Sequence, residues 1–535
     1  MTFSIIDYVI FGLYCALIMG VGLFVSKDKK GHEKSAEDYF LAGKSLPWWA
    51  IGASLIAANI SAEQFIGMSG SGFAAGLAIA SYEWLAAITL IIVGKYFLPI
   101  FIEKGIYTIP EFVEKRFSTQ LKTILAIFWI ALFVFVNLSS VMYLGALALN
   151  GIMGVPLEYG IIGLALFAAG YSIYGGLSAV AWTDVIQVFF LVLGGLFTTY
   201  LALDVLSDGE GWIAGFGQLL ETAPDRFHMI LDEDNPEYSN LPGIWVLVGG
   251  LWVANLYYWG FNQYIIQRTL AAKSLREAQK GIALAAFLKL LIPFIVVIPG
   301  IAAYVMVNDP LIMERLGAEA MSTVPQKSDE AYPWLLQLLP VGMKGIAVAA
   351  LTAAIVSSLA SMLNSTSTIF TMDIYKTYIN KSASDKQMVR TGRITAAAAL
   401  VVASVVAPVL GGIDQAFQYI QEYTGIVSPG ILAVFMLGLF WKKATNAGAM
   451  VGVLLSIPVA LILKFATSLP WMHQMGLTAL ITMLIIAIVS LIGGKGQEDH
   501  KGIPLDKNLF QTSAVFNISA FAIMIICAVF YAIFW

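Results

Sequence analysis

The sequence predicts an all-α integral membrane protein, and three observations support this. Of the 535 residues, 59% are hydrophobic and 12% are charged, against about 25% charged in an ordinary soluble domain. The apolar residues fall in blocks of 20 or more, the length of helix that crosses about 30 Å of hydrocarbon. The alternating ten-residue pattern of an outer-membrane barrel does not occur, so helices are the expected spanning elements.

Fourteen blocks are predicted to be transmembrane helices. They are 7–26, 47–70, 77–101, 121–148, 157–176, 182–206, 243–266, 282–306, 344–372, 391–410, 415–440, 445–465, 475–494 and 513–534. The loops that follow the odd-numbered spans hold 23 of the 30 basic residues. By the positive-inside rule these loops are cytoplasmic, and both termini lie on the outer side. The long outer loops 207–242 and 307–343 are acidic and contain proline, as solvated connections do.

Cysteine and histidine usage narrows the class of protein. The two cysteines, Cys15 and Cys527, lie far apart in separate apolar blocks, and the four histidines lie outside the blocks or at their edges. We therefore expect no disulfide framework, no haem and no intramembrane metalloenzyme. No basic segment precedes the first apolar stretch, which is expected to be a retained helix.

Two blocks of five spans have opposite orientations. Residues 47–206 begin at the cytoplasmic side and residues 243–440 begin outside, as an inverted repeat requires. The first span of each block has an unusual polar cluster, NISAEQ in one and NLYYWGFNQ in the other. Such interruptions indicate a midplane binding site, although two polar spans can also coincide by chance. The expected division is 1–46 (first span and cytoplasmic loop), 47–206 (first repeat), 207–242 (outer loop), 243–440 (second repeat) and 441–535 (three C-terminal spans).

The cluster NISAEQ lies in the middle of a predicted span. Asn59 and Ser61 can hydrogen-bond nearby backbone and compete with the helical ladder. An unwound turn would expose carbonyls near Ala57 and Ile60, which are good ligands for a hard cation. The alternative is a polar helix face that binds neighbouring helices, worth about 1 kcal/mol per bond. Glu63 beside Gln64 favours a functional site, because ionisable groups inside a membrane are costly.

A stripe of small polar side chains follows the ninth span at helical spacing. Its members are Ser357, Ser361, Asn364, Ser365 and Thr368, with Ser358 beside its start. Close packing of small residues explains such a stripe, and so does an oxygen cage completed by the two adjacent hydroxyls. Since the cage has no carboxylate, it would suit a monovalent ion better than calcium.

The seventh span combines amides with aromatic rings. Asn255, Tyr258, Trp259, Asn262 and Gln263 share one predicted helix face, which suits a sugar because amides bind hydroxyls and a ring covers the apolar face. An aromatic belt at the membrane surface is the alternative.

Four further polar residues lie within predicted spans. Glu83, Lys289 and Gln421 add a carboxylate, an ammonium and an amide, and we expect Lys289 to pair with a carboxylate or a substrate hydroxyl. Asp184 opens the span 182–206, where an aspartate usually caps the helix, with a cation exit or second ion site as the alternative.

Six stretches carry a family resemblance: KSAEDYFLAGKSLPWW, SLIAANISAEQFIGMSGSG, YSIYGGLSAVAWTDVIQVFF, NLYYWGFNQYIIQRTLAAKS, AAIVSSLASMLNS and FQYIQEYTGIVSPGILAVF. They are similar to the solute:sodium symporter family, of the sodium/glucose cotransporter type, over essentially the whole chain. The resemblance implies a leucine-transporter-type fold with a five-plus-five inverted repeat. It implies sodium-coupled symport of a galactose- or glucose-type hexose by alternating access, in the bacterial inner membrane, with no enzymatic step and no nucleic acid.

The resemblance also assigns roles to residues. It implies that sodium (Na⁺) is bound by the carbonyls of Ala57, Ile60 and Ala354 and the hydroxyls of Ser357 and Ser358. It implies that the sugar is hydrogen-bonded by Gln64, Glu83, Asn255, Lys289 and Gln421. Tyr258 would stack on the sugar as the inner gate, steadied by Asn59 and with Trp259 alongside, and Met68, Tyr82 and Phe417 would close the outer side. Asp184 would lie along the sodium release path.

Two positions depart from the family pattern. Ala86 stands where a relative has a serine near the sugar, and Phe133 stands where it has a gating tyrosine. A lost polar contact costs roughly 0.5–1.5 kcal/mol, so we expect an altered affinity or epimer preference.

Three rival functions stay open. A proton-coupled sugar symporter would titrate Glu63, Glu83 or Asp184, and a sodium symporter of this fold can carry an amino acid, proline or sialic acid instead. A channel or sensor is the third, but the rings of like groups that line a channel are not seen in the sequence.

Overall fold

The computed structural model describes residues 3–27, 34–317, 320–321, 323–411 and 415–535. Residues 28–33 of the predicted first cytoplasmic loop, and 318–319 and 322 of a predicted outer loop, lie outside these ranges. Within them the chain is helical, with one isolated β-bridge between Leu46 and Ala272. The all-α prediction is therefore confirmed for the described residues.

Twelve helical stretches of the described residues are long and apolar enough to cross a membrane. They are α1 (Ile5–Ser26), the stretch from η2 to α6 (Glu63–Glu103), α8 to α9 (Thr119–Met153), α10 (Leu157–Gly175), α11 (Leu177–Leu206), α16 (Leu275–Asn308), α20 to η9 (Met343–Ile379), α21 to η10 (Asp385–Leu410), α22 (Ala416–Phe440), α23 (Asn446–Ala466), α24 (Trp471–Gly493) and α25 (Ala514–Ile533). The predicted spans 47–70 and 243–266 are not among them as whole helices.

The stretch Glu63–Glu103 contains a turn. Its elements are η2 (Glu63–Met68), α4 (Ser69–Ala75), η3 (Gly76–Ala80), α5 (Ser81–Ile92), η4 (Val93–Phe97) and α6 (Leu98–Glu103). Gly76 has a φ of 75° and a ψ of −149°, outside the helical region. A Cβ at this position would lie 2.4 Å from the carbonyl oxygen of Arg226, so glycine is required on both grounds. The turn separates the end of the predicted second span from the third.

The two missing spans are each interrupted at an extended residue, and the second has a further break between α13 and α14 at Gly249 (φ −118°, ψ −136°). In the first interrupted segment, α3 (Trp48–Asn59) ends before Ile60 (φ −79°, ψ 108°) and the chain resumes as the π-helix η2. In the second, α13 (Ile244–Val248) and α14 (Leu251–Leu256) lead into the π-helix η7 (Tyr257–Phe261), and Asn262 (φ −87°, ψ 121°) precedes α15 (Gln263–Leu270). The first segment therefore runs α-helix, break, π-helix, and the second runs π-helix, break, α-helix.

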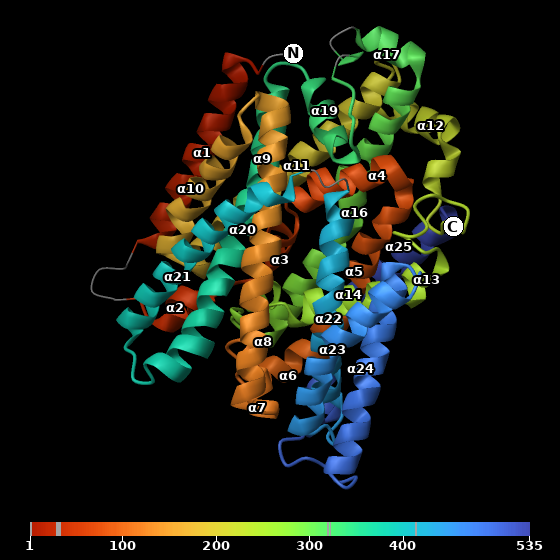
Figure 1. Ribbon diagram of the computed structural model, residues 1–535. Coiled ribbons are helices and arrows are strands. Elements are labelled where there is room, and N and C mark those ends of the chain that lie inside the picture. The colour runs from red at the N-terminus through yellow and green to blue at the C-terminus, as the bar shows by residue number, and fades with distance from the viewer. Residues whose placement is uncertain (1–2, 28–33, 318–319, 322, 412–414) are drawn as a thin grey trace.

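Helix α20 forms the centre of the bundle. Every side chain from Ala347 to Ile369 is buried, against α3, α9, α10, α11, α15 and α21. Helices α1, α10 and α21 lie on one side of it, and α23 and α24 lie on the opposite side of the molecule (Figure 1). Helices α1 and α25 carry many exposed large apolar side chains, as lipid-facing helices do.

Short helices occupy both ends of the bundle. In Figure 1, α12 (Trp212–Thr222), α17 (Pro310–Leu316) and α19 (Ala331–Gln337) lie in the upper part and α7 (Ile109–Arg116) lies near the lower end. Other short elements are α2 (Ala36–Leu41), η1 (Ala42–Lys44), η6 (Pro224–Phe227), η8 (Ser328–Glu330) and η11 (Lys507–Phe510). The expectation that 307–343 is a plain solvated connection was wrong for α19. Its sequence AYPWLLQ is largely apolar, and Tyr332 and Trp334 are buried against the bundle.

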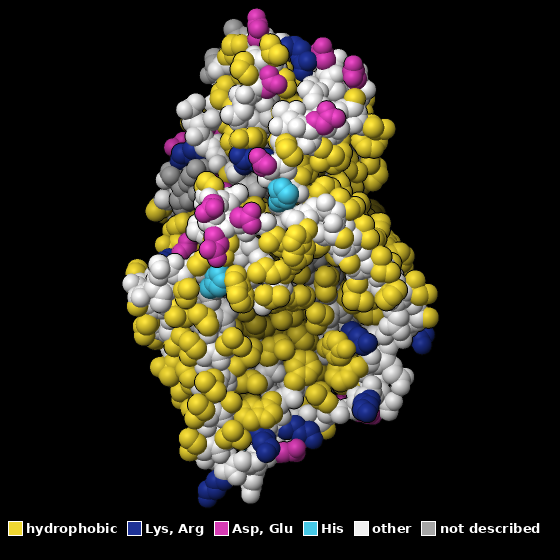
Figure 2. All heavy atoms as spheres, turned by 90° about the vertical axis from the view of Figure 1, so that its right-hand side faces the viewer, with side chains coloured by type: hydrophobic (Ala, Val, Ile, Leu, Met, Phe, Trp, Pro, Cys, Tyr) yellow, Lys and Arg dark blue, Asp and Glu magenta, His cyan; other side chains and the backbone are white. Residues whose placement is uncertain are grey.

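Charge separates the two ends of the molecule. On the face shown in Figure 2, Asp and Glu side chains gather in the upper half and Lys and Arg dominate the lower edge, with an apolar surface between them. This distribution agrees with the loop charges read from the sequence.

Candidate functional site

Side chains redirect the backbone hydrogen bonds at the first interruption. The Ser61 N–H donates to Gln64 Oε1 (2.9 Å) and not to the carbonyl of Ala57, as a continuous helix would require. The Gln64 N–H donates to the carbonyl of Ser61 (3.2 Å) and not to that of Ile60. The Glu63 N–H is accepted by Ser61 Oγ (3.0 Å). The carbonyls of Ala57 and Ile60 have thereby lost their helical donors, and they lie in a segment that is fully buried.

Helix α20 meets this interruption directly. Ser358 Oγ donates to the carbonyl of Ala58 (2.9 Å), which joins α20 to the end of α3. Ser357, its neighbour, donates to Asp184 Oδ1 (2.5 Å), and Ala354 is buried one turn earlier. Peptide carbonyls and hydroxyls without a carboxylate form a donor set that fits a small monovalent cation. The residues therefore fit the predicted sodium site, and Asp184 contacts this site through its hydrogen bond with Ser357.

Asp184 belongs to a buried charged network. It accepts a hydrogen bond from Ser54 Oγ (2.5 Å) as well as from Ser357, and its Oδ2 lies 3.5 Å from Arg268 Nη2. Both charged side chains are fully buried. The interpretation of Asp184 as a helix cap was wrong, because α11 begins after Gly176, about two turns earlier. Arg268, which sequence analysis counted with the cytoplasmic loops, holds α3, α11 and α20 together.

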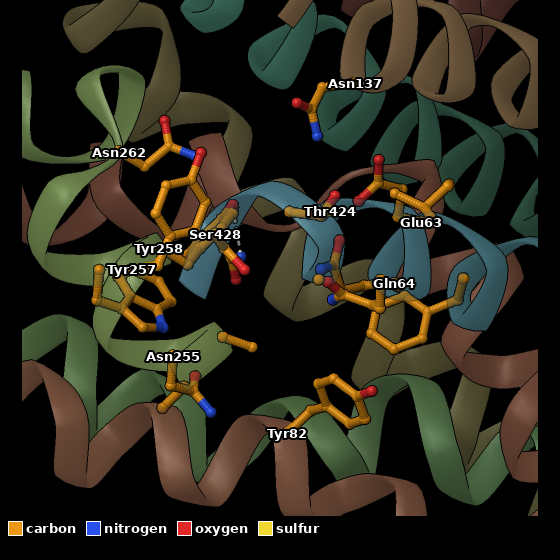
Figure 3. Close-up of a pocket in the computed structure, with 18 of the residues that line it drawn as sticks. Glu63, Gln64, Tyr82, Asn137, Asn255, Tyr257, Tyr258, Asn262, Thr424 and Ser428 are labelled. Carbon is orange, nitrogen blue, oxygen red and sulfur yellow. Dashed lines mark hydrogen bonds between the residues drawn. The ribbon is translucent and has the colours of Figure 1, made fainter. Parts of the chain in front are cut away.

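A polar cavity lies beside the two interruptions. Its lining includes Asn59, Glu63, Gln64, Tyr82, Glu83, Ala86, Asn137, Asn255, Tyr257, Tyr258, Trp259, Asn262, Lys289, Phe417, Gln421, Thr424 and Ser428. Figure 3 shows Gln64 and Tyr82 on one side of the cavity and Asn255 and Tyr258 on the opposite side. All eight residues predicted to contact the substrate thus line one cavity.

Two polar chains connect the cavity to the interruptions. Asn59 Nδ2 donates to the Tyr258 hydroxyl (2.9 Å), which also accepts from the Tyr264 hydroxyl (2.6 Å). Gln64 Oε1 accepts hydrogen bonds from the N–H and the hydroxyl of Ser61, so the Nε2 group is the part of this side chain that can donate into the cavity. Glu63 lines the cavity with a buried Oε1 that has no hydrogen-bond partner among the described residues.

Glu83 and Lys289 form an ion pair in the wall of the cavity. Their side chains are 3% and 1% exposed, and Lys289 Nζ also lies 5.1 Å from the centre of the Trp259 ring. The pairing of Lys289 with a carboxylate agrees with the sequence prediction. A buried charge in this position requires such a partner, because an isolated ammonium would be strongly destabilised.

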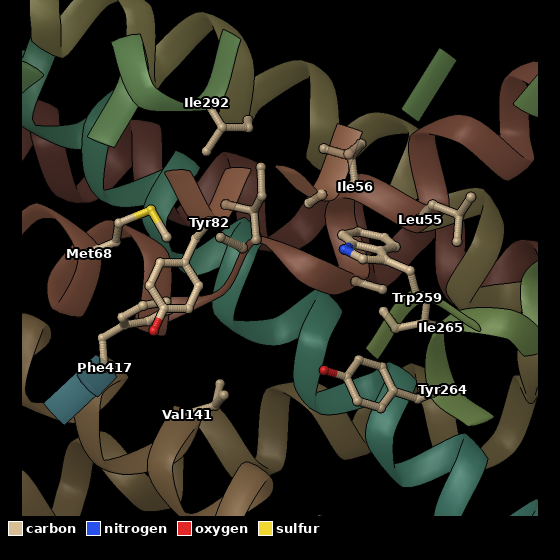
Figure 4. Close-up of a cluster of buried hydrophobic side chains, with 14 of the residues drawn as sticks. Leu55, Ile56, Met68, Tyr82, Val141, Trp259, Tyr264, Ile265, Ile292 and Phe417 are labelled. Atoms are coloured by element: carbon tan, nitrogen blue, oxygen red, sulfur yellow. The ribbon is translucent and has the colours of Figure 1, made fainter. Parts of the chain in front are cut away.

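Of the three side chains predicted to close the outer side, Tyr82 and Phe417 lie in the cavity wall and Met68 does not line the cavity. The rings of Tyr82 and Phe417 meet edge to face at 5.0 Å, and Met68 is fully buried. Figure 4 shows these three grouped together, apart from Trp259 and Tyr264. Trp259 is 2% exposed, so the alternative of an aromatic belt at the membrane surface was wrong for this residue.

The break at Asn262 divides the predicted polar face of the seventh span. Gln263 does not line the cavity; its Oε1 accepts the Ile109 N–H (2.7 Å) at the start of α7. The α20 stripe is divided as well. Ser365 and Thr368 hydrogen-bond Gln267 in α15 (2.8 and 3.0 Å), and Ser361 accepts from Arg268. The second half of the stripe, from Ser361 to Thr368, therefore anchors α15.

Sequence analysis missed several groups that build the site. The spacing Ser61-x-x-Gln64 is a capping-box signature, and it could have predicted where the helix restarts. Asn137 lies in the cavity wall, and its segment 132–138 is a π-helix. Such π-turns occur frequently at functional sites. Of the two departures from the family pattern, Ala86 lines the cavity and Phe133 packs edge to face on Tyr264 (5.5 Å).

Comparison with known proteins supports the same class. The sodium:solute symporter family matches residues 39–456. The sodium/glucose cotransporter of Vibrio parahaemolyticus is 67% identical over 535 residues, which cover 99% of this chain and 98% of that protein. The sodium/myo-inositol cotransporter 2 of Bos taurus is 35% identical over 475 residues, which cover 85% of this chain and 69% of that protein.

Two solved structures share the architecture. A sodium-coupled sialic acid symporter in a substrate-bound outward-open state superposes with a TM-score of 0.79 at 25% identity, over 91% of this chain and 98% of that chain. Mhp1, a nucleobase-cation-symport-1 family transporter in a closed conformation, superposes with a TM-score of 0.51 at 16% identity, over 91% and 99%, and shows the fold alone.

The interrupted helices, their carbonyls and the enclosed cavity define an ion-coupled secondary transporter. The chain belongs to the sodium:solute symporter family, and sodium is its coupling ion.

Proposed function

We propose that this transporter is a fourteen-span sodium/hexose symporter of a bacterial inner membrane. Both termini lie on the outer side, and residues 47–206 and 243–440 form its inverted repeats. The reversed order of α-helix, break and π-helix in the two interrupted segments supports the repeat. The separation of acidic and basic ends supports the orientation. The 67% identical bacterial relative, a sodium/glucose cotransporter, supports the solute and the membrane.

Sodium binds between α3 and α20 in this proposal. Its ligands are the carbonyls of Ala57, Ile60 and Ala354 and the hydroxyls of Ser357 and Ser358, and Asp184 lies on its release path. The observation that carries the proposal is the redirection of the Ser61 and Gln64 N–H groups, which leaves two carbonyls available beside the α20 hydroxyls.

The hexose occupies the cavity next to this ion site. Its hydrogen-bond partners are Gln64, Glu83, Asn255, Lys289 and Gln421, and Tyr258 covers the ring from the inner side, held by Asn59 and beside Trp259. Met68, Tyr82 and Phe417 close the outer side. Bound sodium stabilises the joint between α3 and α20 and so orders Gln64 for the sugar. The membrane potential adds about 2.3 kcal/mol per transported charge per 100 mV.

The charges of the cavity favour a neutral solute. Its one ammonium, Lys289, is already paired with Glu83, and Glu63 adds a further carboxyl group. A carboxylate-bearing solute such as sialic acid would have no unpaired cation in this wall, whereas sugar hydroxyls can bind to both members of an ion pair. A neutral polyol of inositol type has the same chemistry, and competition separates it from the hexoses.

Uptake in proteoliposomes tests the proposal. Labelled glucose and galactose are offered under an inward sodium gradient, an equal potassium gradient, and an inward proton gradient without sodium. We expect accumulation with sodium alone, and loss of accumulation in Gln64→Ala protein that inserts normally. Accumulation with protons alone would instead support the proton-coupled alternative, in which Glu63 titrates. Absence of hexose uptake under all gradients would refute the hexose assignment.

A further inference from the structure

A second polar hollow lies at the end of the molecule that carries the basic loops. It has a volume of about 240 Å³ and is lined by Lys104 and Ile106, which follow α6, by residues of α7 and by residues 500–504 between α24 and α25. Every ionisable side chain in its lining is basic: Lys104, Lys115, Arg116, His500 and Lys501. The hollow is separate from the substrate cavity, whose lining shares no residue with it.

Arg116 is the buried member of this group. It is 2% exposed; Nε donates to the carbonyl of Gly438 (2.9 Å) and Nη2 to that of Ala444 (2.8 Å). Its Nη1 has no hydrogen-bond partner among the described residues, and Asp499 Oδ1 is 3.6 Å away. Burial lowers the pKa of this guanidinium and the Asp499 carboxylate opposes the shift. A second anion next to Arg116 would also favour the charged guanidinium, as Asp499 does.

Lys104 and Lys501 keep donors available for a ligand, and Lys115 does not. Lys115 Nζ contacts Glu111 Oε1 (2.9 Å), the carbonyl of Lys104 (3.0 Å) and that of Gly105 (3.3 Å), which matches its three protons. Lys501 Nζ donates to the carbonyl of Phe117 (2.8 Å) and lies 3.5 Å from that of Glu114, and Lys104 is exposed at the edge of the hollow. Because an ammonium has three protons and His500 adds a further ring nitrogen, the wall keeps donors that these acceptors do not use.

We propose that this hollow binds a phosphate group. A tetrahedral oxyanion with several acceptor oxygens matches a guanidinium N–H and converging ammonium groups, and charge-assisted bonds of this kind are about twice as strong as neutral ones. The group is carried by a soluble phosphomonoester or by the headgroup of an anionic phospholipid, since both present the same chemistry to the basic end of the bundle.

Helix α7 connects this site to the second interrupted segment. The Ile109 N–H at its start donates to Gln263 Oε1 (2.7 Å), directly after the break at Asn262. Arg116 at its end donates to the carbonyl of Gly438, in the last turn of α22, and to that of Ala444 just after this helix, which also carries Phe417 and Gln421. A phosphate bound to α7 and residues 500–501 therefore stabilises the observed contact between α7 and α15. This role lies outside the transport cycle proposed above.

Thermal unfolding of the purified full chain tests the soluble form of the ligand. The midpoint is measured in detergent against inorganic phosphate, with sodium chloride at matched ionic strength as the reference. Three proteins are compared: wild type, Lys104→Glu, and Lys381→Glu as a matched exposed lysine far from the hollow in sequence. We expect a saturable rise in the midpoint for wild type and Lys381→Glu, and an affinity about tenfold weaker for Lys104→Glu.

The lipid form is tested with the same proteins in nanodiscs of phosphatidylcholine with or without phosphatidylglycerol. A Lys104-dependent stabilisation by phosphatidylglycerol, without a saturable response to inorganic phosphate, assigns the group to a lipid headgroup. The proposal is overturned when neither inorganic phosphate, compared with chloride, nor phosphatidylglycerol gives a stabilisation that depends on Lys104. Since the readout is unfolding and not uptake, this outcome is independent of the hexose proposal.

Discussion

The two interrupted segments have the same kind of break and use it differently. At Ile60 the Ser61 N–H turns to the Gln64 side chain and the Gln64 N–H turns to the carbonyl of Ser61, so the break exposes the backbone oxygens of Ala57 and Ile60. At Asn262 no side chain caps the restart of the helix, and the carbonyl of Asn262 itself accepts from Ile265 and Ile266. One break presents carbonyls, and the other aims aromatic and amide side chains at the cavity.

The segments also differ in how they are anchored. The helix after the second break, α15, is tied to α20, α3 and α11 by Gln267 and by the fully buried Arg268. In the described part of the chain, the hydrogen bond from Ser358 to the carbonyl of Ala58 joins the first break to α20. The helix after the second break is therefore held to its neighbours by more polar side-chain contacts than the first break is.

Removal of the charged anchor of the second segment is expected to have the largest effect. Arg268→Ala leaves Asp184 buried without its cation, and breaking such a pair costs about 3–5 kcal/mol of folding free energy. The midpoint of thermal unfolding in detergent measures the loss. The double variant Arg268→Ala/Asp184→Ala removes both charges and should recover part of the stability; equal losses in the single and double variants would contradict the assignment.

Changes at Gln64 separate the two roles of the first break. Gln64→Ala removes both the acceptor for Ser61 and the donor for the sugar, and we expect sodium-driven uptake to fall about a hundredfold, or roughly 2.8 kcal/mol. Gln64→Glu keeps the capping acceptor. It should therefore retain the sodium concentration for half-maximal uptake while the KM for hexose rises. A Gln64→Glu protein whose sodium dependence is as poor as that of Gln64→Ala would show that the cap is unimportant.

Substitutions in the first half of the α20 stripe, at Ser357, and in its second half, at Ser365, should affect sodium dependence differently. Ser357→Ala removes a proposed sodium ligand, and we expect the sodium concentration for half-maximal uptake to rise about tenfold, or about 1.4 kcal/mol, with uptake largely restored at saturating sodium. Ser365→Ala is the matched control, because its hydroxyl bonds Gln267 and not the ion site. Uptake is measured over a range of external sodium, and equal shifts in both variants would argue against an ion site at Ser357.

The smallest expected effect is at the cavity wall. Ala86→Ser adds a hydroxyl within the lining and should change hexose affinity by roughly twofold to tenfold, the range of one hydrogen bond of 0.5–1.5 kcal/mol. Ala87→Ser is the control, since Ala87 is fully buried outside the lining. Inhibition of labelled glucose uptake by unlabelled galactose and inositol gives the change in preference. An effect of Ala87→Ser equal to that of Ala86→Ser would mean that packing, and not a sugar contact, is responsible.

The sequence made the location of the site predictable but not its connections. Asn59, Glu63, Gln64, Glu83 and Lys289 are costly in an apolar span, so composition alone directs attention to them. The contact of Asp184 with Arg268 depends on how four helices pack, and neither residue has a local signal for its partner. Arg268 was assigned to a loop because charge counting along the chain cannot distinguish a buried arginine from a solvated one near a helix end.

The π-turns also explain why a predicted face was incorrect. Helical spacing places Asn255, Tyr258 and Gln263 on one side of a regular helix, but η7 changes the number of residues per turn and Asn262 is extended. Gln263 therefore points to α7. Periodicity is reliable for uninterrupted helices such as α20, and it fails at the positions where function requires an interruption.

Two of the proposed ion ligands in the first segment are peptide oxygens, which every amino acid carries. Substitution of Ala57 or Ile60 by another residue of similar size would leave these oxygens in place, whereas the sugar contacts change with each side chain. This carbonyl part of the proposed ion site therefore does not depend on side-chain identity, whereas the Ser357 and Ser358 hydroxyls and the solute contacts do. A lineage built on this segment can acquire new solutes while it keeps one energy source, as the glucose, inositol and sialic acid carriers that resemble this chain illustrate.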